Sequence, residues 1–98
     1  MQVTLSQAQE IAQVAIEAKI QASDKLRHFT FDRAILVREY PPCWTFAAFS
    51  EEMAEADYAP SGVFVYIDKS DGHVWTKEQH HDYFYAYEKK AQRQPIAA

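Results

Sequence analysis

The chain is poor in cysteine and glycine, and each shortage excludes a class of protein. Cys43 is its one cysteine, so no intramolecular disulfide framework can form. Gly62 and Gly72 are its two glycines, too few for the glycine-rich loops that cradle phosphate groups. The N-terminus has no basic stretch followed by an apolar run, and no segment approaches the roughly 18–20 apolar residues of a membrane span. We therefore expect a cytoplasmic protein with no membrane partner.

Basic charge is also in short supply. Fourteen acidic and ten basic side chains give a net charge of −4, so a polyanion such as DNA or RNA would be repelled on average. A basic protein is a better match for this charge, although mild acidity also serves solubility. The 98 residues are 48% apolar and 24% charged, as in ordinary globular proteins. One domain over residues 1–98, with a frayed tail from about residue 93, is the expected organisation.

Two segments carry helix signals. The first begins after Thr4, which forms a capping-box pattern with Gln7, and apolar residues then recur at helical spacing as far as Ala18. Most of that stripe is alanine, which would let the helix lie close to a sheet. The second helix begins after Thr76, with Gln79 completing the same capping pattern, and reaches nearly to residue 92.

Short branched and aromatic runs between the helices predict strands. Residues 34–37 and 43–49 would form a hairpin around Pro41–Pro42, because proline cannot sit inside a ladder. Residues 62–68 are apolar on both faces, which predicts a central strand. A short antiparallel strand over 73–75 follows a tight turn. The sequence thus predicts an α+β fold: an N-terminal helix, a three- to four-stranded antiparallel meander and a C-terminal helix.

Little in the sequence is typical of metal binding or catalysis. Glu78 and His81 form one Glu-x-x-His unit, whereas carboxylate-bridged metal sites use two such units with further carboxylates. His80 points about 100° away from its neighbour on a helix, so the two imidazoles cannot share an ion. Cys43 lacks a recognisable nucleophile environment and is expected to be an inert thiol. We predict no catalytic residue, no metal and no cofactor.

Residues 51–57, called the acidic segment here, are the best candidates for binding a partner. Their four carboxylates create a negative field that could steer a basic partner, or could simply keep a loop solvated. Tyrosines are enriched at interfaces, and Tyr83 and Tyr85 are expected to be exposed while Phe84 and Tyr87 cover the sheet. The candidate partner-binding residues are Glu51, Glu52, Glu55, Asp57, Tyr58, Tyr83 and Tyr85.

Short motifs between residues 4 and 90 carry a resemblance to a known family. They are Trp44-Thr45-Phe46, the acidic stretch to Ala59-Pro60, Val65-Tyr66-Ile67-Asp68-Lys69 with Asp71-Gly72-His73-Val74, and Tyr83 and Tyr87 with Glu88-Lys89-Lys90. In order and spacing they resemble the YrhB-like proteins, small bacterial proteins grouped with the immunity proteins of polymorphic toxin systems. The chain departs from that pattern at Cys43, where relatives tend to have glycine, at Tyr58, where they commonly have asparagine, and in a shortened connection over 76–78.

The resemblance implies an antitoxin-like role, in which the protein binds a cognate toxin and blocks its active site. Toxins that act on nucleic acids tend to be basic, which the acidic segment fits. The family also implies a second role, that of a heat-stable chaperone-like protein. A third hypothesis comes from the residues alone: a small α+β enzyme with a pocket between helix and sheet, using His73, Asp68 and Asp82. The sequence does not decide the oligomeric state, and a homodimer is compatible with all three hypotheses.

Overall fold

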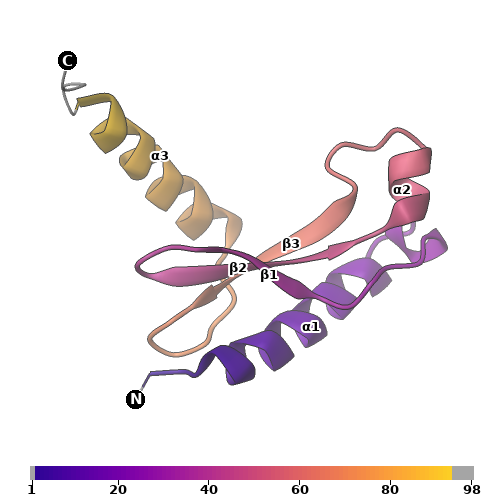
Figure 1. The fold of residues 1–98 in the computed structure, drawn as a ribbon, viewed down its shortest axis with the longest axis horizontal. Helices are drawn as coiled ribbons and strands as arrows, with labels where there is room; N and C mark the ends of the chain where they lie inside the picture. Colours follow the sequence, from indigo (N-terminus) through magenta and orange to yellow (C-terminus); the bar gives the residue numbers. More distant parts are fainter. Residues whose placement is uncertain (1, 94–98) are drawn as a thin grey trace.

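The protein is described by a computed structural model that places residues 2–93, with the surroundings of side chains given as far as Ala86. Its elements follow the expected α+β order (Figure 1). In chain order they are α1 (Leu5–Gln21), η1 (Leu26–His28), β1 (Ile35–Glu39), β2 (Cys43–Phe49), α2 (Glu51–Glu55), β3 (Gly62–Asp68) and α3 (Lys77–Arg93). The predicted tail lies largely outside the described residues.

Both long helices begin at the capping boxes that the sequence predicts. The Thr4 hydroxyl accepts a hydrogen bond from the Gln7 amide at 3.1 Å, and the Gln7 side chain accepts one from the Thr4 amide at 2.9 Å. Thr76 and Gln79 repeat the arrangement at 3.1 and 3.0 Å. Each pair satisfies amide groups that the first turn of a helix leaves without a partner, which is why both helices start there.

The sheet has the order β1-β2-β3, and all its strands pair antiparallel. The prediction that residues 62–68 form the central strand was wrong, because β2 is central and β3 lies beside it. β3 is apolar on both faces for another reason: Val65 and Ile67 pack under α1, while Phe64 and Tyr66 are half-buried on the opposite face.

The expected fourth strand is reduced to one bridge between Ile67 and Val74. The Trp75 amide still donates to the Tyr66 carbonyl at 2.8 Å. The capping box at Thr76 then turns the chain into α3, so the returning segment ends before a strand can form.

The main core lies between α1 and one face of the sheet. Ala8, Ala12 and Ile16 of α1 are fully buried, and they pack in one cluster with Phe46 and Val65. Two alanines on the contact stripe let the helix backbone approach the strands closely, as the sequence predicts.

β1, one of the two edge strands of the sheet, is exposed along its whole length, and its pairing is irregular. A bulge interrupts its pairing with β2 between Leu36 and Arg38. Just before β1, the Ala34 amide donates to the Gln13 side chain at 2.8 Å, and Gln9 donates to the Ala34 carbonyl. Bulges and covered backbone groups are devices that prevent another strand from adding to an edge.

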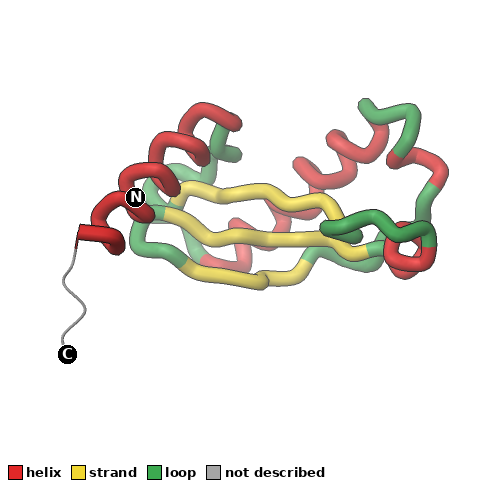
Figure 2. Tube along the Cα trace, turned by 90° about the horizontal axis from the view of Figure 1, so that it is seen from above, coloured by secondary structure: helices red, strands yellow, loops and turns green. Residues whose placement is uncertain are grey.

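The helices α2 and α3 lie on the side of the sheet away from α1 (Figures 1 and 2). α2 stands at one end of the sheet and α3 leaves from the other end. Between them, no helix of residues 2–93 lies over the strands (Figure 2). The two ends therefore hold the two groups of predicted partner-binding residues.

Candidate interaction surface

The acidic segment is built on the short helix α2. The Ser50 hydroxyl caps this helix by accepting from the Met53 amide at 3.2 Å. Met53 is 5% exposed and anchors the turn, so Glu51 and Glu55 face solvent. Carboxylates in the first turn also suit the positive end of the helix dipole.

Two of the four carboxylate residues have structural roles as well. Glu52 accepts a hydrogen bond from the Thr30 amide at 2.5 Å, which ties α2 to the chain before β1. Asp57 ends the turn with a φ of 65°, a left-handed conformation that aspartate tolerates better than most residues. The acidic segment is therefore held in a defined shape.

Tyr58 packs against its own chain. Its ring lies edge-on to Phe29 with centroids 5.6 Å apart, and the Lys25 ammonium sits 4.0 Å from the ring centroid. These contacts leave the side chain half-buried. Tyr58 thus supports the shape of the acidic end more than it offers an open ring.

Tyr83 and Tyr85, both predicted to be exposed, differ in their exposure to solvent. Tyr85 is 57% exposed, in agreement with the prediction. The expectation that Tyr83 is exposed was wrong: it is half-buried, with its ring centroid 6.1 Å from Tyr40 and 5.5 Å from Trp75. Tyr40 follows β1, so its contact with Tyr83 joins segments far apart in the sequence, whereas Trp75 lies just before α3.

Phe84 packs on the sheet side as predicted, with centroids 4.9 Å from Tyr40 and 5.7 Å from Tyr66. The predicted contact of Tyr87 lies outside the described side chains. His80 also faces the sheet, 4.1 Å from the Tyr66 ring, and burial lowers the pKa of its imidazole. The first half of α3 therefore docks through rings.

A further group of residues was not singled out from the sequence. Strand alternation places every second residue of β2 on the face away from α1, and the register brings residues of β1 and β3 beside them. In the part of this face between α2 and α3, these residues form what is called the open face: Ile35, Ala47, Phe49 and Phe64. The alternation was visible in the sequence, but which face would stay uncovered was not.

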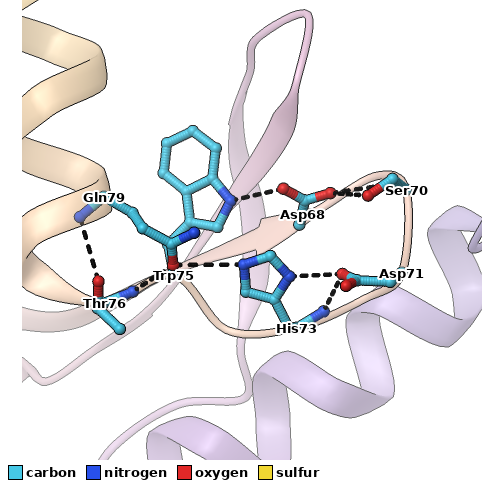
Figure 3. A network of polar contacts seen from close by, with 7 residues as sticks. All are labelled: Asp68, Ser70, Asp71, His73, Trp75, Thr76 and Gln79. Atoms are coloured by element: carbon cyan, nitrogen blue, oxygen red, sulfur yellow. Dashed lines mark hydrogen bonds and ion pairs between the residues drawn. The ribbon is translucent and has the colours of Figure 1, made fainter.

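The turn after β3 brings Asp68 together with the residues that follow it (Figure 3). One Asp68 oxygen accepts from the Ser70 amide at 2.8 Å, and the other accepts from the Trp75 indole at 2.9 Å. Hydrogen bonds from Ser70 and Trp75 hold the pKa of Asp68 below its ordinary value, although partial burial opposes them as the largest single effect. This carboxylate fixes the turn.

His73 in the same turn pairs with Asp71. Its Nδ1 lies 2.5 Å from an Asp71 oxygen, which also accepts from the His73 amide at 2.9 Å, and its Nε2 lies 3.3 Å from Gln79 (Figure 3). The hydrogen bond to Asp71 raises the pKa of His73, and the reciprocal bonds lower the pKa of Asp71.

Potential ligand atoms of Asp68, Asp71 and His73 lie within 4.8 Å of one another, the one such group in the described part of the chain. The same oxygen and nitrogen atoms make the hydrogen bonds that shape the turn. Of the residues expected in an enzyme site, Asp82 is not in this group and lies 3.7 Å from His81 on α3.

Cys43 is fully buried at the start of β2. Burial, reinforced by the nearby Asp68 carboxylate, raises the pKa of its thiol to about 11. A thiol with so high a pKa has little thiolate near neutral pH, so it is a poor nucleophile.

Comparison with profiles of protein families, with curated proteins and with solved structures finds no match to this chain. Within the described residues, no helix combines the length and apolar character needed to cross a bilayer.

Proposed function

We propose that this chain is a toxin-neutralising immunity protein that binds a basic cognate toxin directly. The observation that carries the proposal is the acidic segment, a set of carboxylates held on a capped and anchored turn. A preformed charged surface steers a partner without the entropy cost of ordering a loop on binding. The motif resemblance described above points to the same role.

Co-expression with each toxin that is found encoded beside this gene tests the proposal. Protection of the host cell and a complex on gel filtration are the expected results. Loss of viability despite co-expression, together with no complex, would count against the role.

Charge reversal tests the part played by the acidic segment. The variant E51K/E55K should bind the same toxin with a slower association rate and a weaker dependence of that rate on salt. The matched control E10K/E17K changes the net charge equally on exposed positions of α1. If both variants slow association alike, only total charge matters and the segment has no special role.

A chaperone-like role is the second candidate, and the exposed apolar residues favour it. Ile35, Leu36 and Val37 follow one another on β1 and are 52%, 38% and 38% exposed, and contiguous apolar surface of this kind can bind unfolded clients. Suppression of aggregation of unrelated proteins would support this role, whereas an immunity protein shows a sharp preference for one partner.

A further inference from the structure

The exposed apolar surface of the open face comes from Ile35, Phe49 and Phe64, because Ala47 is fully buried between its neighbours on the adjoining strands. α1 covers the opposite side of the sheet, and α2 and α3 stand at the two ends (Figures 1 and 2). Ile35, Ala47 and Phe64 lie side by side across the three strands in the paired register. Ile35 is 52% exposed, and Phe64 is half-buried.

Phe49 extends this face toward α2 in a fixed geometry. Its ring lies edge-on to Phe64 with centroids 5.8 Å apart. Gly62 is paired with Phe49, and a Cβ there would lie 2.9 Å from the ring and 2.7 Å from the Ala48 carbonyl. The missing side chain at Gly62 lets the ring lie against the strand, so the apolar surface is formed before any partner arrives.

The charges around the open face indicate what would cover it. Phe49 leads through Ser50 directly into α2, so Glu51 and its neighbours border the apolar residues at that end. Arg38 pairs with Thr45 and lies toward the α3 end, and Lys25, over the Tyr58 ring, is a single cation against the four carboxylates of the acidic segment. An apolar centre bordered by charge is the usual anatomy of a protein interface.

We infer that the open face is the docking surface for the partner of the proposed function, and that it receives a segment that is apolar in its middle and basic where it meets α2. The inference rests on the immunity role and adds the place and chemistry of the contact. The acidic segment speeds the encounter, and the open face holds the complex together.

A pair of charge-matched variants tests the inference with the toxin encoded beside the gene. I35E introduces a carboxylate on the open face, and V14E introduces the same charge at an exposed position of α1. We expect I35E to weaken binding at least about 30-fold through faster dissociation, as at an interface hot spot, and V14E to change it less than about 3-fold. Added negative charge would favour a basic partner, so a loss in I35E reports lost apolar contact.

Each other outcome has a definite meaning. A complex that I35E and V14E form equally well overturns the docking surface and leaves the immunity role intact. Failure of the unchanged protein to bind the toxin removes both. Sedimentation of the unchanged protein as a dimer that I35E dissociates, with toxin binding unaffected, would show that a second copy covers this face, and would also overturn the inference.

Discussion

Replacing Gly72 by alanine should strongly destabilise the fold. Gly72 has a φ of 78° in the turn after β3, and its amide donates to the Asp68 carbonyl at 2.9 Å. An added Cβ would lie 2.9 Å from the Val3 side chain and 3.0 Å from the Ile11 side chain. The substitution therefore strains the backbone and crowds the contact between the turn and the start of α1.

The size of the effect follows from these two terms. A left-handed conformation costs a residue with a Cβ about 1–2 kcal/mol. Crowding in a packed region costs about 1–3 kcal/mol. The sum is about 2–5 kcal/mol, and a loss of about 3 kcal/mol lowers the Tm of a domain of this size by roughly 12–24 °C.

Urea unfolding followed by tryptophan fluorescence measures the loss. The control is the double variant V3A/G72A, which removes the side chain nearest to the new Cβ and leaves the backbone strain. It should lose less stability than the sum of the two single variants. If G72A stays within about 0.5 kcal/mol of the unchanged protein, the turn adapts and the reasoning about this glycine is wrong.

Two further predictions concern titratable groups. Cys43 should react with a thiol reagent at about pH 8 only as fast as the protein opens, because its side chain is fully buried, and burial also raises its pKa to about 11; rapid labelling of the folded protein would contradict this burial. The raised pKa of His73 and the lowered pKa of Asp71 mean that their pairing stabilises the fold most between the ordinary values of 3.8 and 6.5. This contribution is lost as pH rises through the raised pKa of His73, and as pH falls through the lowered pKa of Asp71. In the D71N variant, NMR titration should show the His73 pKa moving down toward its ordinary value, and an unchanged pKa would exclude the pairing.

The sequence predicts local structure well here because the signals are local. Both capping boxes act within four residues, and the alanine stripe of α1 needs only helical spacing and an apolar partner surface. The alternation in residues 43–49 likewise follows from the strand itself. These features need no knowledge of the rest of the chain.

The errors concern contacts between distant segments. The apolar residues of β3 predicted a central strand with a neighbour on each side. Their burial comes instead from α1 on one face and from aromatic rings on the other. Tyr83 was expected to be exposed because Phe84 and Tyr87 were assigned to the side of α3 that covers the sheet. Its cover comes from Tyr40 and Trp75, whose position depends on how α3 leaves the sheet.

The hydrogen bonds that join Gln9 and Gln13 to Ala34 affect which substitutions this protein can tolerate. Both side-chain amides bind the main chain of Ala34. The attachment of the start of β1 to α1 therefore does not depend on the side chains that follow along β1. Ile35, Leu36 and Val37 can be exchanged while the strand remains fastened in place. The side chains on the outer edge of the sheet can thus change with little effect on the stability of the fold.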